Sequence, residues 1–282
     1  MHHVPEKYKK TVSILGCGWL GLPLAERLVQ RGYRVNGSTT TPGKQHRLAE
    51  AGITPYLLTL DPWLHGDQVG DFFRADVLFF NIPPGRRRPD VDAYFGAVVD
   101  ALLTELTYSP IAFVVFASST SVYASMNGTV VEGDAGKPRP WSLSGRALLD
   151  AERRFQEDPH FDATVLRYAG LYGYDRAPGR FLAGRTHLDN GQAPVNLVHR
   201  DDAVAVAEAI IVQDVRADVF NVCADAHPTR AAVYTRAAQR LGLDPPGFVE
   251  EGTRSFKIVS NRKLKEQLGF RFRYPDPRDE AP

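Results

Sequence analysis

The chain has 282 residues, 43% of them hydrophobic, which is enough for one large core or for a core with a smaller satellite domain. Its formal net charge of +1 gives no indication of a basic surface for nucleic acid or an anionic membrane, and no apolar run is long enough to cross a bilayer. The polar start of the chain is unlike a secretory signal, and two cysteines do not suggest a disulfide framework. We therefore expect a cytoplasmic globular protein that binds a small molecule, and neither nucleic acid nor membrane.

Short apolar runs alternate with segments of helical periodicity through the first 170 or so residues. The predicted strands cover residues 11–15, 33–37, 54–60, 76–81, 111–117 and 163–167. The predicted helices cover residues 20–31, 43–51, 93–106 and 145–157. Strands that are apolar throughout and alternate with helices form parallel sheets covered on both faces. The sequence therefore predicts the α/β class, with a Rossmann-type doubly wound parallel sheet.

The composition changes after Gly173. Residues 174–194 are rich in Gly, Pro, Arg and Asp and leave room for only a short helix. Further helices are predicted over 202–213, with Asp201 or Asp202 as N-cap, and over 229–241. A strand at 218–223 and a last strand and helix between 256 and 268 complete the pattern. We predict a dinucleotide-binding Rossmann domain over 8–173 and about 195–224, interleaved with a smaller α/β substrate domain formed by 174–194 and 225–282.

Three glycines, Gly16, Gly18 and Gly21, form the pattern G-x-G-x-x-G between the first strand and the first helix. In this context Gly16 permits a tight turn, Gly18 lets the backbone approach a pyrophosphate, and Gly21 lets the helix pack on the strand. The helix N-terminus then faces the phosphates. We predict that this loop, with its Trp19 and Leu20, binds a nicotinamide cofactor. The alternative is an ordinary strand-to-helix turn.

The residues that follow the second strand indicate whether such a site prefers NAD or NADP. An NAD site usually offers an acidic residue there, for the adenosine ribose. This chain offers Ser38, Thr39, Thr40 and Thr41, followed by Lys44 and Arg47, and no acid. Hydroxyls and cations suit a 2′-phosphate, so NADP(H) is the preferred prediction and NAD(H) the second. A polar turn with solvated basic side chains is the alternative.

Four later segments match one family. Residues 118–123 (S-S-T-S-V-Y) are similar to S-S-x-x-V-Y-G, and residues 166–173 (L-R-Y-A-G-L-Y-G) to L-R-x-x-x-x-Y-G. Residues 198–202 (V-H-R-D-D) are similar to H-V-x-D, and residues 220–222 (F-N-V) to Y-N-V. Together with the glycine loop, these segments resemble the extended short-chain dehydrogenases/reductases over nearly the whole chain. This group contains nucleotide-sugar epimerases and dehydratases, and the likeness is strongest to its atypical bacterial members.

The resemblance implies roles for further residues. Cofactor contacts are expected at Asp61, Asn81, Ile82, Pro83, Ser118, Tyr168 and Gly170. Substrate contacts are expected at Arg86, Arg180, Arg185 and His199, although solvated or structural roles are alternatives for each. Ser119 falls at the position of the family's catalytic Ser/Thr, and Tyr123 is a candidate substitute acid. We expect no metal, and the resemblance allows a homodimer.

The family's catalytic Tyr and Lys are absent at the expected positions. They form Y-x-x-x-K, with a glutamate four residues after the lysine. Anchoring on Glu152 places Leu148 at the lysine and Ser144 at the tyrosine. Because a positioned acid or base contributes about 10²–10⁴ in rate, two interpretations stay open. One is an oxidoreductase or epimerase/dehydratase-like enzyme acting on a small polar carbonyl or sugar(-nucleotide) compound. The other is a non-catalytic NADP(H)-binding sensor or scaffold.

Overall fold

The computed structural model describes residues 10–85, 88–249 and 255–279, and it divides into two compact units. The first unit comprises the chain up to Val122, Pro140–Leu166 and Ala207–Val219. The second comprises Tyr123–Arg139, Arg167–Val206 and the chain from Phe220 onward. The sequence assigns residues 123–139, 167–173, 195–206 and 220–224 to the Rossmann domain, whereas in the structure they group with the second unit.

The central feature is a mostly parallel sheet of eight strands, which confirms the predicted fold class. Strand β1 is parallel to β2 and β5, β2 is parallel to β3, and β5 is parallel to β6. A short edge strand, β4, runs antiparallel to β3. The strand order is β11 (Val219–Val222), β8 (Asp162–Tyr168), β6 (Phe113–Ser119), β5 (Val77–Phe80), β1 (Thr11–Leu15), β2 (Arg34–Thr39), β3 (Thr54–Leu60) and β4 (Leu64–Gly66).

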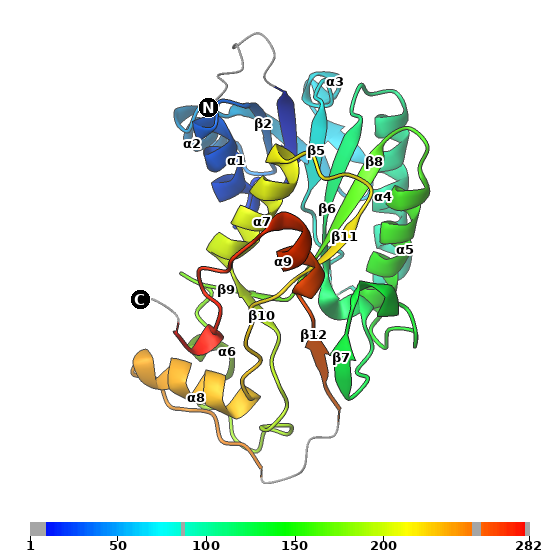
Figure 1. Cartoon of the computed structure of the whole chain (residues 1–282). Helices are drawn as coiled ribbons and strands as arrows, with labels where there is room; N and C mark the ends of the chain where they lie inside the picture. The colour runs from blue at the N-terminus through cyan, green and yellow to red at the C-terminus, as the bar shows by residue number, and fades with distance from the viewer. Residues whose placement is uncertain (1–9, 86–87, 250–254, 280–282) are drawn as a thin grey trace. The chain divides into compact units, whose positions relative to one another are not determined.

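Helices cover both faces of the sheet in the first unit. Helices α1 (Gly21–Gln30) and α2 (Gln45–Glu50) lie on one face, and α4 (Val91–Thr107) and α5 (Leu143–Glu157) on the other (Figure 1). Rings from β5, β6, α4 and α5 pack together with centroid separations of 5.1 to 6.3 Å. This buried aromatic layer covers the apolar residues 77–80 and 111–117 on one face of the sheet. The rings are Phe80, Phe95, Phe116 and Phe155.

The second unit contains two small parallel strand pairs, and of their four strands the sequence predicted only the last one, within residues 256–268. Strand β9 (Gly170–Tyr172) pairs with β10 (Leu197–His199), and β7 (Gly128–Val130) pairs with β12 (Lys257–Val259). Each of these strands has three residues, too few for a periodic signal. The helices of the second unit are α6 (Gly179–Leu182), α8 (Arg230–Arg240), α9 (Arg262–Leu268) and the first part of α7 (Arg200–Val212).

Several predicted boundaries shift. Strand β2 runs to Thr39, two residues beyond the predicted end. The helix predicted at 43–51 begins as a 3-10 turn, Pro42–Lys44, and the short helix α3 (Val69–Phe72) was missed. The predicted N-cap role of Asp201 or Asp202 is wrong, because α7 begins at Arg200 and contains both acids. Within the ranges that the structure describes, no helix is both long and apolar enough to cross a membrane.

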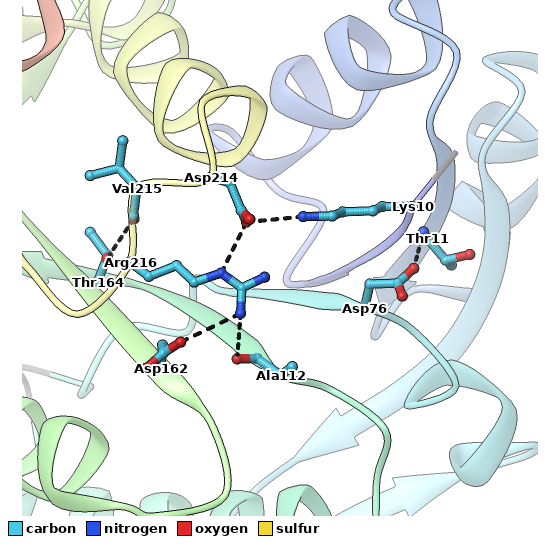
Figure 2. Close-up of polar contacts among 9 residues, drawn as sticks. All are labelled: Lys10, Thr11, Asp76, Ala112, Asp162, Thr164, Asp214, Val215 and Arg216. Carbon is cyan, nitrogen blue, oxygen red and sulfur yellow. Dashed lines mark hydrogen bonds and ion pairs between the residues drawn. The ribbon is translucent and has the colours of Figure 1, made fainter. Parts of the chain in front are cut away.

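The amino ends of β1, β6 and β8 are held by an ionic cluster centred on Arg216, in the turn between α7 and β11 (Figure 2). The Arg216 guanidinium donates to the Asp214 carboxylate at 3.0 Å and to the Ala112 carbonyl at 3.3 Å. It also reaches Asp162 at 3.4 Å, and Lys10 pairs with Asp214 at 3.0 Å. This cluster lies at the end of the sheet opposite the glycine loop, so it stabilises the fold away from the candidate site.

Candidate functional site

The three glycines of the loop differ in what surrounds them. Gly16 has φ +106°, and a Cβ there would lie 2.9 Å from the Asn81 carbonyl oxygen. A Cβ on Gly21 would lie 2.2 Å from the Gly16 carbonyl oxygen. Gly18 is exposed, and a Cβ there would meet no atom within 4 Å. Gly16 and Gly21 are therefore required by the loop itself, whereas Gly18 faces open space.

Two neighbouring strands hold the loop in place. The Gly16 N–H donates to Ser38 Oγ at 2.8 Å, and the Cys17 N–H donates to the Ser38 carbonyl at 2.9 Å. From the other side, the Asn81 side-chain amide donates to the Gly16 carbonyl at 3.2 Å. The first turn of α1 has N–H groups without intrahelical partners, which suits an anion. The loop thus has the shape and polarity of a phosphate cradle.

The end of β2 carries buried hydroxyls, and the segment that follows it carries exposed ones. The Ser38 side chain is buried, with 3% of its surface exposed, and Thr39 Oγ1 accepts a hydrogen bond from the Thr41 N–H at 3.1 Å. Thr40, Lys44 and Arg47 are exposed. Ser38 therefore shapes the glycine loop, and the side chains accessible to a ligand are those of Thr40, Thr41 and the two cations.

The other predicted cofactor residues of the first unit follow β3 and β5. Asp61 is exposed directly after β3, Ile82 is half-buried and Pro83 is exposed after β5. Because β1, β2, β3 and β5 are mutually parallel in that part of the sheet, their carboxyl ends share one edge with the glycine loop. Arg86 lies outside the described residues.

The two serines at the end of β6 have different surroundings. Ser118 is buried, and its hydroxyl donates to the buried Glu152 carboxylate of α5. Ser119 is half-buried, and its Oγ accepts a hydrogen bond from the Ser121 N–H at 3.2 Å. That bond leaves the Ser119 hydroxyl proton available for donation. Ser118 therefore connects β6 to α5, and the substrate contact of Ser119 stays a prediction.

The start of α5 packs directly on this turn. Ser142 Oγ caps the helix by accepting from the Gly145 N–H at 3.0 Å, and a Cβ on Gly145 would lie 2.3 Å from the Ser121 carbonyl oxygen. Ser144 is half-buried, and Leu148 has 2% of its surface exposed. The position that the motif assigns to a lysine is therefore occupied by a core side chain. The correspondence with the family's Tyr and Lys stays a prediction.

In the second unit, Tyr123 is part of a buried polar network. Its hydroxyl donates to Asn221 Oδ1 at 2.6 Å and accepts from the Arg167 guanidinium at 2.8 Å. Burial raises the pKa of Tyr123 to about 12, although Arg167 acts to lower it. Its proton is thus already engaged, which favours a structural role over that of a substitute acid.

Lys257 of β12 is a polar residue near Tyr123 that the sequence motifs missed. Its Nζ donates to the Tyr123 carbonyl at 2.7 Å, and burial lowers its pKa to about 8. No local pattern distinguishes this lysine from the other basic residues of 255–279, because its burial arises from β12 pairing with β7.

His199 lies in an aromatic cluster. Its ring centroid is 3.8 Å from that of Tyr274 and 5.2 Å from that of Tyr172, and a Cβ on Gly173 would lie 2.5 Å from Nε2. Burial lowers the pKa of His199. Asp202 accepts hydrogen bonds from the N–H groups of Arg273 and Tyr274, at 2.8 and 2.9 Å. His199 and Asp202 thus anchor the segment after α9.

The remaining predicted residues of the second unit are scattered. The buried Tyr168 hydroxyl donates to the Ala203 carbonyl at 3.2 Å, and the exposed Gly170 donates its N–H to the Asn196 carbonyl at 3.0 Å. Arg180 and Arg185 are exposed. Among the described residues no group of three or more His, Cys, Asp or Glu side chains is placed to hold a metal.

Comparisons with known proteins agree with this architecture. No family model matches the chain. It is 38% identical over 274 residues to protein YeeZ of Escherichia coli (strain K12), covering 95% of this chain and 97% of that one. The fold matches UDP-glucuronic acid 4-epimerase from Bacillus cereus, solved with NAD, with a TM-score of 0.77, 18% identity and 95% of each chain covered. It also matches a short-chain dehydrogenase/reductase superfamily protein from Agrobacterium tumefaciens with bound NAD, with a TM-score of 0.74, 19% identity and coverage of 93% and 92%.

The sheet, its helical layers and the glycine loop define a Rossmann-type fold, which the chain shares with these two structures. Within that fold class, the identity over nearly the full length of both sequences shows that the chain belongs to the family of protein YeeZ.

Proposed function

We propose that the protein binds a nicotinamide dinucleotide through its first unit. The observation that carries this proposal is the empty space at Gly18, in a loop whose other two glycines are sterically required and whose position is held by Ser38 and Asn81. A pyrophosphate against Gly18 would meet the N–H groups at the start of α1. The two structural neighbours described above were solved with NAD, which supports the same site.

Within this proposal, NADP(H) is preferred over NAD(H). Thr40, Lys44 and Arg47 are exposed after β2 and can surround a 2′-phosphate with a hydroxyl and two cations. Asp61, after β3, contacts the adenine. Ile82 and Pro83, after β5, line the nicotinamide-side ribose. Ser38 and Asn81 act indirectly, by shaping the loop.

We further propose an oxidoreductase or epimerase-like reaction on a small polar carbonyl or sugar(-nucleotide) compound. The cofactor, when bound, exchanges a hydride with substrate carbon. Ser119 donates a hydrogen bond to the substrate oxygen, since its proton is not used within the turn. Arginine and lysine outnumber aspartate and glutamate among the described residues of the second unit, and Arg180 and Arg185 are exposed there. These cations favour an anionic substrate.

The test uses the intact chain and measures dinucleotide binding before turnover. Energy transfer from Trp19 in the loop to the reduced nicotinamide reports binding, and calorimetry gives the affinities for NADPH and NADH. We expect NADPH to bind at least about tenfold more tightly, because charge-assisted hydrogen bonds to a phosphate are lost with NADH. Absence of binding to either dinucleotide would overturn the proposal. Oxidation of NADPH is then followed with a panel of aldehydes, ketones and sugar nucleotides.

A second function is favoured by α5. On the predicted correspondence, Leu148 takes the place of the family's lysine and is buried, and Ser144 takes the place of the tyrosine and carries only a hydroxyl. Neither position then supplies an acid or base of the strength of that pair. The protein would then be a sensor or scaffold that holds NADP(H) without turnover. Tight NADPH binding, with no oxidation across the panel, identifies this function. Assembly as a homodimer stays a prediction for either one.

A further inference from the structure

Three side chains from different segments meet at the carboxyl edge of the sheet in the first unit. Asp61 directly follows β3, whereas Arg88 and Tyr94 follow β5, with Tyr94 in the first turn of α4. Strands β1 and β2 stand between β3 and β5, so about 14 Å of sheet separates them. Contacts among these residues therefore span the edge from which the glycine loop and Thr40 project.

The contacts form a connected set. The Tyr94 hydroxyl is hydrogen-bonded to the Asp61 side chain; burial raises the pKa of Tyr94, and this bond raises it further. The Arg88 guanidinium carbon lies 3.9 Å from the centre of the Tyr94 ring, and its Nε is 3.4 Å from the Asp90 carboxylate. Arg88 and Asp61 are exposed and Tyr94 is half-buried, so a ligand can reach all three.

This arrangement matches the chemistry of an adenine ring. An adenine presents two flat faces and one exocyclic amino group that donates hydrogen bonds. The Asp61 carboxylate can only accept, and the Tyr94 hydroxyl limits the directions in which it points. A guanidinium whose carbon lies 3.9 Å above a tyrosine ring has a second face for stacking, and base stacking of this kind tolerates different bases.

We propose that Tyr94 and Arg88 complete an adenine clamp, in which Tyr94 positions Asp61 toward the exocyclic amino group and Arg88 stacks on the ring. This inference rests on the proposed function, because the adenine belongs to the dinucleotide held at Gly18. It assigns selectivity for the base to Tyr94 and base-independent affinity to Arg88.

The experiment compares NADPH with its deamino analogue, reduced nicotinamide hypoxanthine dinucleotide phosphate, on the full chain by calorimetry. The analogue carries an oxo group in place of the amino group and so presents an acceptor to Asp61. We expect wild-type protein to prefer NADPH by about tenfold or more. Tyr94→Phe keeps the ring under Arg88 but releases Asp61, so the preference should fall below about threefold. Arg88→Ala should weaken both ligands by a similar factor of about ten.

Matched controls are available away from the edge. Tyr108→Phe removes a hydroxyl from a tyrosine that is 87% exposed, and Arg74→Ala removes an exposed arginine; both should behave as wild type. Equal binding of the two dinucleotides by wild-type protein, or a full preference retained in Tyr94→Phe, overturns the clamp alone. An Arg88→Ala variant with unchanged affinities overturns the stacking role. A wild type that binds neither dinucleotide overturns the proposed function, and the clamp with it.

Discussion

The Gly16 N–H donates a 2.8 Å hydrogen bond to Ser38 Oγ, so a side chain of β2 fixes the turn that follows β1. This bond, with the Asn81 amide on the Gly16 carbonyl, satisfies both polar groups of one peptide residue from two flanking strands. The loop is therefore shaped before any ligand arrives. A preorganised loop loses little conformational entropy on binding, which favours affinity.

Ser38→Ala should weaken this preorganisation. The Gly16 N–H would lose its side-chain partner, at a cost of about 1–3 kcal/mol in the free energy of unfolding. NADPH affinity should fall as well, since the loop would have to be ordered on binding. Urea denaturation and calorimetry measure the two effects. Thr59→Ala, at an exposed position of β3, is the control, and a Ser38→Ala protein with wild-type affinity would contradict the role assigned to the bond.

Gly18→Val should abolish dinucleotide binding while leaving the protein folded. A side chain there meets no protein atom within 4 Å, so it occupies only the space assigned to the pyrophosphate. We expect a loss of more than about 100-fold in NADPH affinity with an unchanged melting temperature. Gly21→Ala is the contrasting variant: its Cβ would lie 2.2 Å from the Gly16 carbonyl oxygen, so its melting temperature should fall. Wild-type NADPH affinity in Gly18→Val would exclude this loop as the site.

The double variant Lys44→Ala/Arg47→Ala should reduce the preference for NADPH over NADH. Both side chains are exposed after β2, and each can donate a charge-assisted hydrogen bond to the 2′-phosphate. The preference should fall by about tenfold or more, with NADH affinity nearly unchanged. Parallel titrations with both dinucleotides check this. A double variant that keeps the wild-type ratio would place the phosphate elsewhere.

Ser119→Ala separates the two proposed functions. In an enzyme, the variant should lose about tenfold or more in turnover while NADPH affinity stays nearly intact, because the hydroxyl contacts substrate oxygen. Turnover on a substrate found in the panel, measured beside NADPH binding, gives both quantities. In a sensor there is no turnover to lose. A fully active Ser119→Ala enzyme would remove Ser119 from the mechanism.

His199 should make stability depend on pH. Burial lowers its pKa, Asp201 acts to raise it, and Arg200 and Arg273 lower it further. Because the unfolded chain then binds a proton at a higher pH than the folded protein, acid favours unfolding. The contribution of His199 is fully present above the unfolded pKa of about 6.5 and decreases below it.

The melting temperature of the wild type should therefore fall more steeply between about pH 7.5 and 5.5 than that of His199→Gln. Scanning calorimetry across that range measures the slopes, and His65→Gln, at an exposed position, serves as the control. Identical slopes in the wild type and His199→Gln would show that the buried imidazole does not titrate in this way.

Local patterns were sufficient for the fold class and for the glycine loop. A strand such as β3 was predicted at its observed bounds because its apolar run is bordered by Gly52 and Asp61. The three-residue strands β7, β9 and β10 were missed, because pairing with distant segments creates them and three residues carry no periodicity. Strand β12 lies within the last strand and helix that were predicted between 256 and 268. The predicted N-cap role of Asp202 failed for a related reason. Its carboxylate accepts hydrogen bonds from the N–H groups of Arg273 and Tyr274, some seventy residues away, instead of from the first turn of its own helix.

The sequence by itself determined that strands and helices alternate, that a glycine loop follows the first strand, and that hydroxyls and cations follow the second. These properties depend on residue type and spacing, which are local. Only the tertiary structure decided which of these hydroxyls are buried and which are exposed. Strand β2 continues to Thr39, so Ser38 lies within the strand, buried against the loop, and Thr40 is exposed. Likewise, the Tyr123 hydroxyl donates its hydrogen bond to Asn221 Oδ1, and Tyr94 lies beside Asp61, because side-chain direction and long-range packing set their partners.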